Sequence, residues 1–357
     1  MLELLKPTNR KEKVLFYNVS EVAMNRRAIA QQLKKGNTKL STSHFKESKL
    51  PSAVKNQNIR EVKALYRLFK KSNSKKENIE FKMNQPICFN NQNFKIDEHF
   101  ISFALYKERI KRFAFPVKQT KRLTDLLSHI EQGSKLGKAS LFYRKGNWYF
   151  AVTVHVAKKT ISHSNVMGID IGLRQLAVAS IQNNNGKEIN RKFHNGKQAG
   201  FIRKKYRATR RKLGLAKQPH LIKQLSDKEQ RWITDLNHKI SRQLINLAVQ
   251  EKVGYIVMEN LKNIRQTARS LKRADRTLHS WSFYQLQHFI ECKAELEGIE
   301  VKFIHPKHTS QRCSTCKQIN QANRKGNQYI CVCGNKTHAD LNAGRNIAYA
   351  YMEQQSA

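Results

Sequence analysis

The stretch "GIDIGLRQLAVAS", Gly168–Ser180, decides the fold of this 357-residue chain. Apolar residues on both sides of a glycine turn predict two short strands that are buried in a sheet. One acid, Asp170, lies inside this apolar stretch. Because a buried ionised carboxylate costs several kcal/mol unless it is paired or binds a metal, Asp170 is a candidate functional residue.

Two further acids occur where apolar segments end or begin. Glu259 follows the buried-type strand of "GYIVMENL" (residues 254–261), and Asp340 in "THADLNAGRNIAYAY" (residues 337–351) lies at or near a helix N-terminus. Each alone has a structural explanation, as a helix N-cap for Asp340 or as the partner of an arginine for the other two. Together they could converge on one sheet edge and hold two Mg²⁺ ions, which support phosphodiester hydrolysis.

The charge of the chain indicates a polyanionic partner. Lys and Arg number 68 against 26 Asp and Glu, a formal net charge of +42, which favours nucleic acid. An anionic membrane is the rival partner. The N-terminus "MLELLKPTNRKEK" lacks a signal-peptide core, and no apolar run approaches the roughly 18 residues of a spanning helix. We therefore expect a cytoplasmic, nucleoid-associated protein with neither a membrane partner nor a small-molecule substrate.

The remaining patterns predict the order of the elements. Basic amphipathic helices are expected first, followed by a β-rich unit with a hairpin turn at Asn90–Asn91 and then by strands that alternate with helices. Within this last region, the Asn-rich segment is expected to be a loop. The ranges are helices at 21–37, 58–78, 231–250 and 281–296, β segments at 79–96, 147–157, 166–180 and 299–306, and the loop at 182–198.

A basic run follows the first predicted strands of the C-terminal half. Seven of the ten positions of Arg203–Lys212 are Lys or Arg. A solvated helix face is the structural alternative, but the global charge and the embedded Tyr206 favour contact with phosphates. The candidate nucleic-acid-binding residues are Arg203, Lys204, Lys205, Arg207, Arg210, Arg211 and Lys212.

Four cysteines predict a structural zinc site. "CSTC" places Cys313 and Cys316 in one knuckle, and "CVCG" adds Cys331 and Cys333. The second pair is CxC, whose alternate side chains point the same way in an extended segment. His338 or His308 ranks below Cys333 as the fourth ligand, and free reactive thiols are the alternative to a metal. The isolated cysteines, Cys88 and Cys292, are expected to be packing residues.

Three stretches in this order, "GIDIGLRQLAVAS", "GYIVMENLKNI" and "CSTC…CVCGNKTHADLNAGRNIA", resemble the RuvC-like nuclease of the TnpB family, the transposon-encoded relatives of type V CRISPR effector nucleases. The resemblance covers the chain from about residue 140 onwards. It implies that Asp170, Glu259 and Asp340 are the catalytic acids, with two Mg²⁺, and that a zinc ribbon holding one Zn²⁺ precedes the third acid.

The resemblance implies a fold class and a domain order. The class is α/β: a RuvC (ribonuclease H-like) nuclease domain with an inserted zinc ribbon, and an N-terminal β-barrel-like wedge domain carrying a helical recognition insert. The expected ranges are 1–15 and 76–160 for the wedge-like domain, 16–75 for the helical recognition domain, 161–304 and 338–357 for the nuclease domain, and 305–337 for the ribbon, in a monomer or weak dimer.

The function implied is RNA-guided DNA endonuclease. The expected partners are a guide RNA from the transposon end and a double-stranded DNA target beside a short adjacent motif. In-line attack by an activated water would leave 5′-phosphate and 3′-hydroxyl ends. An RNA-guided repressor that does not cut and a guide-independent, structure-selective nuclease are the alternatives.

Three departures from the family pattern are visible. They are the CxC pair, the short "MLEL" before "LKPT", and Gly344 where the family usually has Ala. The first two bear on the geometry of the ribbon and on reading of the motif beside the target. The three acids are all present.

Overall fold

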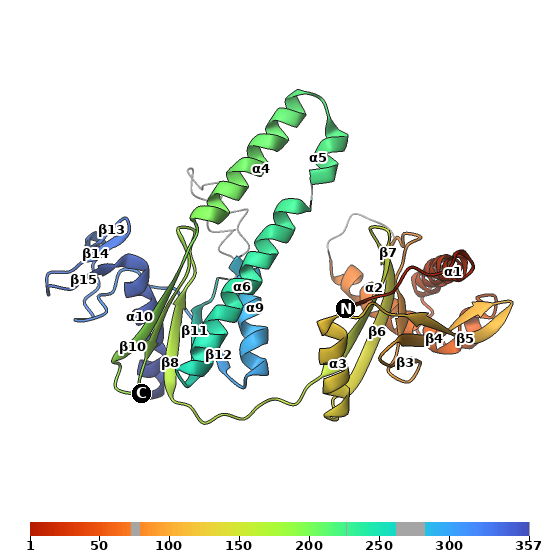
Figure 1. The fold of residues 1–357 in the computed structure, drawn as a ribbon, viewed down its shortest axis with the longest axis horizontal. Coiled ribbons are helices and arrows are strands. Elements are labelled where there is room, and N and C mark those ends of the chain that lie inside the picture. Colours follow the sequence, from red (N-terminus) through yellow and green to blue (C-terminus); the bar gives the residue numbers. More distant parts are fainter. Residues whose placement is uncertain (73–78, 226, 262–282, 357) are drawn as a thin grey trace. The chain divides into compact units, whose positions relative to one another are not determined.

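The structure is a computed structural model that describes residues 1–72, 79–225, 227–261 and 283–356. The chain forms two compact units, Met1–Ala157 and Lys158–Ala357, which are described separately below. Helices and strands are labelled in Figure 1.

The described residues of the N-terminal unit form two antiparallel sheets and three α-helices. The helices are labelled in Figure 1. One sheet has the order β1-β7-β6-β2 and the other β3-β4-β5. Its strands are β1 (Leu2–Glu3), β2 (Ile87–Phe89), β3 (Phe94–Ile96), β4 (Phe100–Lys107), β5 (Arg109–Pro116), β6 (Lys135–Arg144) and β7 (Asn147–His155). Its helices are α1 (Asn9–Lys34), the short 3₁₀ helix η1 (Thr42–Phe45), α2 (Ser52–Lys71) and α3 (Lys121–Glu131).

Aromatic packing joins the two sheets into one core. The Phe103 ring from β4 lies parallel to that of Phe150 from β7, with centroids 5.5 Å apart, and also stacks on Phe115. The first half of α1 adds Val14 and Leu15 to the same cluster. Since one face of each sheet and one stripe of the helix are apolar, burying them together stabilises the unit.

The predicted hairpin at Asn90–Asn91 is wrong. The chain turns there, with a hydrogen bond from Asn93 N–H to the Asn90 carbonyl, but the flanking strands do not pair with each other. Instead β2 pairs with β6 and β3 pairs with β4. Strands of three residues depend on longer neighbours, and turn residues alone do not specify which neighbour that is.

The C-terminal unit is built on a five-stranded mixed sheet of order β10-β9-β8-β11-β12. β11 runs parallel to β8 and β12, whereas β9 and β10 are antiparallel to their neighbours. The strands are β8 (Asn165–Asp170), β9 (Gln175–Gln182), β10 (Glu188–Asn195), β11 (Val253–Glu259) and β12 (Glu300–Ile304). The helices are α4 (Lys197–Leu215), α5 (Pro219–Leu225), α6 (Lys228–Gln250), α9 (Phe283–Leu296) and α10 (Ala339–Ser356).

Helices cover both faces of this sheet (Figure 1). α10 packs on one face against β8 and β9, and α6 and α9 pack on the other. The closest approach of α10 occurs at Gly168, where a Cβ atom would lie 2.2 Å from the Gly344 carbonyl oxygen. A glycine is required here because the helix and strand backbones nearly touch.

Two sequence expectations need adjustment in this unit. The segment expected as an Asn-rich loop contains β10, an edge strand that pairs with β9. Because an edge strand has one neighbouring strand and most side chains of β10 are exposed, its sequence is polar and lacks the apolar pattern of a buried strand. The helix predicted at 231–250 is α6, which starts slightly earlier; its buried face includes Ile240 and Leu244, while Trp232 near its start is partly buried. The start of the helix expected near Trp281 lies outside the described residues.

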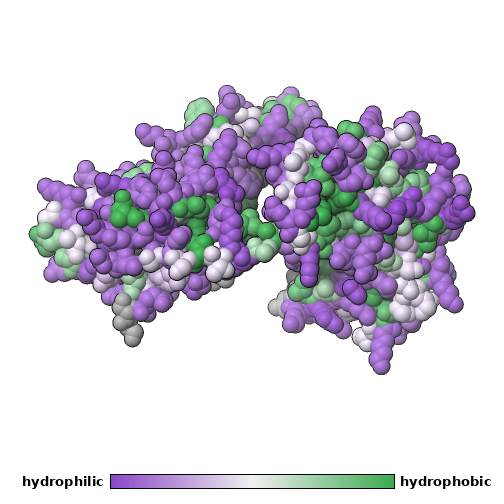
Figure 2. All heavy atoms as spheres, turned by 60° about the horizontal axis from the view of Figure 1, so that its bottom comes forward, coloured by the Kyte–Doolittle hydropathy of each residue, from purple (hydrophilic) through white to green (hydrophobic). Residues whose placement is uncertain are grey.

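The surface is strongly polar. The face shown in Figure 2 is mainly hydrophilic with scattered apolar patches. Among the described residues, no helix combines the length and apolar character that crossing a membrane requires.

Candidate functional site

Three acids from distant parts of the sequence share one pocket. Asp170 is the last residue of β8, Glu259 is the last residue of β11, and Asp340 lies in the first turn of α10. Since β8 and β11 are parallel neighbours, their carboxyl ends reach the same edge of the sheet. All three side chains line a cavity of about 610 Å³. The structure therefore brings together the acids that the sequence singled out.

The acids are crowded enough to disfavour full ionisation. Burial, and then the nearby charges of Glu259 and Asp340, raise the pKa of Asp170 to about 8. Burial also raises the pKa of Glu259, although the Thr309 hydroxyl and the charge of Arg324 act in the opposite direction. A divalent cation would relieve this repulsion, so the donor set fits hard cations such as Mg²⁺.

Two residues of this pocket were given no functional role from the sequence. Arg324, at the start of β13 in the ribbon, donates from Nη2 to Asp340 Oδ1 at 2.9 Å. Thr309, which follows β12, donates its hydroxyl to Glu259 Oε1. An arginine among 68 basic residues and a threonine in a polar segment do not stand out until the fold places them beside the acids.

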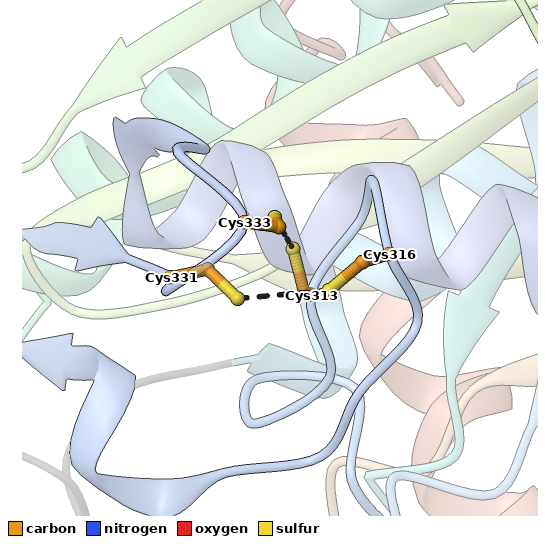
Figure 3. Close-up of side chains that lie close together, drawn as sticks. All are labelled: Cys313, Cys316, Cys331 and Cys333. Atoms are coloured by element: carbon orange, nitrogen blue, oxygen red, sulfur yellow. Dashed lines mark hydrogen bonds between the residues drawn. The ribbon is translucent and has the colours of Figure 1, made fainter.

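The ribbon lies between β12 and α10. Its small sheet has the order β13-β14-β15, with β13 (Arg324–Lys325), β14 (Gln328–Ile330) and β15 (Lys336–His338), and a short 3₁₀ helix, η2 (Gln321–Asn323), precedes β13. Two knuckles approach each other beside these strands (Figure 3). The first carries Cys313 and Cys316, and the second carries Cys331 and Cys333.

The four cysteine sulfurs fit a tetrahedral zinc site. All four Sγ atoms lie within 4.8 Å of one another, and the Cys313–Cys333 and Cys316–Cys331 pairs are each 3.6 Å apart. A tetrahedron with Zn–S bonds of about 2.3 Å has S–S edges of about 3.8 Å. The two thiols of the CxC pair converge because residues 331–334 form a turn, in which the Gly334 N–H donates to the Cys331 carbonyl at 3.0 Å, and not because the segment is extended, as the sequence suggested.

The histidine alternatives for the fourth ligand have other contacts. His308 Nδ1 lies 3.0 Å from Gln311 Oε1, and the backbone N–H of Asp340 donates to His338 Nδ1. The thiols of the cluster differ: although the Gln318 backbone N–H acts in the opposite direction, burial and hydrogen bonds with the other cysteines raise the pKa of Cys316 to about 12. Although burial raises the pKa of Cys313, N–H donors from the Cys316 backbone and the Asn335 side chain outweigh it and lower that pKa to about 6.

The isolated cysteines differ from each other. Cys88 is buried in the N-terminal unit, as expected for a packing residue. Cys292 on α9 is exposed, so its assignment as a packing residue was wrong. Its position on the outer face of an amphipathic helix, which the sequence alone does not orient, accounts for the difference.

The basic run lies on α4, which extends beyond the sheet (Figure 1). Arg203 is buried, and Arg210 forms an ion pair with Glu229 of α6. The other members of the run, Lys204, Lys205, Arg207, Arg211 and Lys212, are exposed. The run therefore combines a packed side with an exposed cationic side.

The mixed sheet, its helical layers, the acids at the carboxyl edge and the inserted cysteine ribbon define a ribonuclease H-like α/β fold of the RuvC type. Two family models match residues that lie mostly in the C-terminal unit. The Cas12f1-like TNB domain matches residues 283–347, and the model described as a probable transposase, OrfB_IS605, matches residues 149–265. The chain is a relative of the TnpB-like and Cas12f proteins, which confirms the resemblance seen in the motifs.

Individual relatives support this placement. The chain is 35% identical over 219 residues to the CRISPR-associated endodeoxyribonuclease Cas12f1 of Sulfoacidibacillus thermotolerans, covering 57% of this chain and 50% of that protein. It is 40% identical over 97 residues to the TnpB-like protein MJ0751 of Methanocaldococcus jannaschii, covering 27% of this chain and 34% of that protein. It is 27% identical to the TnpB-like protein aq_aa05 of Aquifex aeolicus, covering 66% of this chain and 84% of that protein.

A solved structure shares the fold. The chain aligns with the protein in a cryo-EM structure of a Cas12f1–sgRNA–target DNA complex with a TM-score of 0.74 and 19% identity, covering 95% of this chain and 83% of that one. The chain spans about half the length of the Cas12f1 proteins that it matches, with coverages of 50%, 54% and 43%.

Proposed function

We propose that this protein is an RNA-guided DNA endonuclease of the TnpB and Cas12f type. The observation that carries the proposal is the shared pocket of Asp170, Glu259 and Asp340, which is suited to divalent cations and is open to a substrate. The formal charge of +42 fits polyanionic partners. The relatives named as endodeoxyribonucleases, and the complex with sgRNA and target DNA, support the same partners.

In the proposed mechanism, Asp170, Glu259 and Asp340 hold two Mg²⁺ ions. When bound, such ions activate a water and stabilise the leaving oxygen of a phosphodiester. The two strands aim Asp170 and Glu259 from a rigid sheet edge, and α10 contributes Asp340 from its first turn. Arg324 pairs with Asp340 and carries positive charge into the pocket, where it is placed to meet a phosphate of the cut strand.

The ribbon has a structural role in this proposal. The four cysteines hold one Zn²⁺, which closes the two knuckles on each other. Arg324 belongs to the small sheet beside these knuckles, so a folded ribbon is needed to deliver its guanidinium to the pocket. Zinc in the ribbon therefore stabilises the fold and supports catalysis only indirectly.

The exposed residues of the basic run are proposed to contact phosphates. The residues concerned are all exposed on α4: Lys204, Lys205, Arg207, Arg211 and Lys212. Arg203 and Arg210 belong to the packed side, so we assign them to the stability of the helix. The guide RNA is proposed to derive from the transposon end, and the predicted domain ranges remain part of this proposal.

The decisive experiment combines RNA identification with cleavage. The protein is purified with its bound RNA, which is sequenced, and a plasmid carrying the matching target is then incubated with the complex in Mg²⁺. We expect a single structured RNA with a variable end, and cutting that Asp170→Ala abolishes without loss of RNA or DNA binding. Undiminished cutting by Asp170→Ala would refute the catalytic assignment.

The same experiment separates the two alternatives. A repressor would bind the target with its RNA and leave the plasmid intact in Mg²⁺. A structure-selective nuclease would cut branched DNA without any RNA. Retention of all three acids in one pocket favours the endonuclease over the repressor.

A further inference from the structure

Glu259 receives a hydrogen bond from a residue outside the catalytic acids. The Thr309 hydroxyl donates to Glu259 Oε1, and Thr309 is 7% exposed. Gln287 of α9 also contacts Glu259, but its Nε2 donates to the main-chain carbonyl at 2.7 Å and leaves the carboxylate free to turn. Among the residues that the structure describes, Thr309 is thus the hydrogen-bond donor that orients this carboxylate.

The backbone around Thr309 is fastened to the helix that carries Asp340. Asn346 of α10 donates from Nδ2 to the Thr309 carbonyl at 2.8 Å and to the Arg312 carbonyl at 2.6 Å. Asn342, one turn earlier, donates to the same Arg312 carbonyl at 2.7 Å. Both asparagines are buried, so these bonds are protected from water.

The same attachment reaches the first zinc knuckle. Asn342 Oδ1 accepts a hydrogen bond from the backbone N–H of Ser314, the residue after Cys313, at 2.9 Å. One short segment, Thr309–Ser314, therefore contacts Glu259 at one end, enters the cysteine cluster at the other, and is held along its length by α10. The segment links the Glu259 carboxylate to the helix that carries Asp340.

We infer that Thr309 is a positioning residue, whose hydroxyl fixes the Glu259 carboxylate in the orientation that binds a divalent cation together with Asp340. The inference rests on the proposed function of the pocket. A glutamate has three rotatable side-chain bonds, and a hydrogen bond to one carboxylate oxygen removes much of that freedom while the other oxygen stays available to a cation. Loss of such a partner commonly weakens metal affinity or activity by about tenfold to a hundredfold.

The test compares Thr309→Val, which keeps the shape and removes the hydroxyl, with Thr309→Ser, which keeps the hydroxyl. Mg²⁺ is titrated calorimetrically into each purified, Mg²⁺-free protein, and zinc content is measured in parallel by mass spectrometry. We expect Mg²⁺ affinity to fall about tenfold to a hundredfold in Thr309→Val and to stay close to that of the unmodified protein in Thr309→Ser. Zinc content should be unchanged in both.

Thr124→Val, an exposed change on α3 in the other unit, is the matched control and should leave Mg²⁺ affinity unaltered. Equal Mg²⁺ affinity in the Val and Ser variants would overturn the inference, as would loss of affinity in both. If Thr309→Val does not fold, Thr309→Ala replaces it and the Ser and Ala variants are compared for the same hydroxyl.

Cleavage by the RNA complex separates this inference from the proposed function. If the unmodified protein binds Mg²⁺ but never cuts a matched target, the proposed function fails, whereas the titration still decides the role of Thr309. If the unmodified complex cuts and Thr309→Val cuts equally well at limiting Mg²⁺, the inference fails and the proposed function stands.

Discussion

Replacing Asp170 by asparagine should stabilise the metal-free protein while abolishing the proposed DNA cleavage. Burial and the charges of Glu259 and Asp340 raise the pKa of Asp170 from 3.8 to about 8. Each pKa unit corresponds to about 1.4 kcal/mol, so at pH 7 keeping this side chain in its folded environment costs about 4 kcal/mol. Because Asp170 is electrostatically coupled to its acidic neighbours, we expect Asp170→Asn to gain about 2–4 kcal/mol.

The sign follows from proton linkage. Between pH 3.8 and about 8 the folded protein binds the proton that the unfolded chain has lost, so the stability of the metal-free protein falls as pH rises through this window. The gain from Asp170→Asn should therefore be large at pH 7 and shrink towards zero near pH 4. Saturating Mg²⁺ should stabilise the unmodified protein and have little effect on the variant.

Differential scanning calorimetry in Mg²⁺-free buffer measures this gain. For a unit of this size, 2–4 kcal/mol corresponds to a rise in Tm of roughly 4–16 °C at pH 7. Asp170→Glu retains the charge and serves as the control, so it should not be stabilised. A fall or no change in Tm for Asp170→Asn at pH 7, or a gain that does not depend on pH, would refute the electrostatic reasoning.

Three further outcomes are expected. Gly168→Ala should lower the free energy of unfolding by about 1–3 kcal/mol, because its Cβ would lie 2.2 Å from the Gly344 carbonyl oxygen. Gly344→Ala, whose Cβ would lie 3.2 Å from the Val178 carbonyl oxygen, should change it by less than about 1 kcal/mol. Urea unfolding measures both values, and the reverse ranking would show that the two backbones do not approach each other at this point. Cys333→Ser should reduce the zinc bound per chain in native mass spectrometry, and full retention of zinc would point to a different fourth ligand. Replacing both Lys204 and Arg207 by Gln should reduce the slope of log affinity against log salt concentration by about 2 in nucleic-acid binding. An unchanged slope would show that these two residues of α4 face solvent and do not contact phosphates.

The departures from the family pattern have local explanations. At Gly344, where the family usually has Ala, a Cβ would lie 3.2 Å from the Val178 carbonyl oxygen and 3.5 Å from the Gly168 carbonyl oxygen, so glycine avoids a tight contact. The CxC pair still delivers both thiols to the cluster. The short N-terminal segment nevertheless contains β1, which pairs with β7.

Sequence periodicity was most reliable where burial is strong and local. β8, β9 and β11 are apolar on both faces, so their composition alone identified them, and each predicted acid ends its strand or begins its helix where expected. It failed at β10, which is exposed and polar, and at the short strands β2 and β3, whose partners lie far along the chain. Local patterns report burial, but they do not report which distant strand provides the hydrogen bonds.

The sequence by itself determined the identity of the three acids, the four cysteines, the cationic character and the family resemblance, because these depend on residue type and spacing. Only the tertiary structure decided that Asp170, Glu259 and Asp340 meet, since parallel pairing of β8 with β11 and the packing of α10 are non-local contacts. It also revealed Arg324 and Thr309 as their neighbours. A side chain acquires such a role from what folding places within hydrogen-bond distance, which no single stretch of sequence encodes.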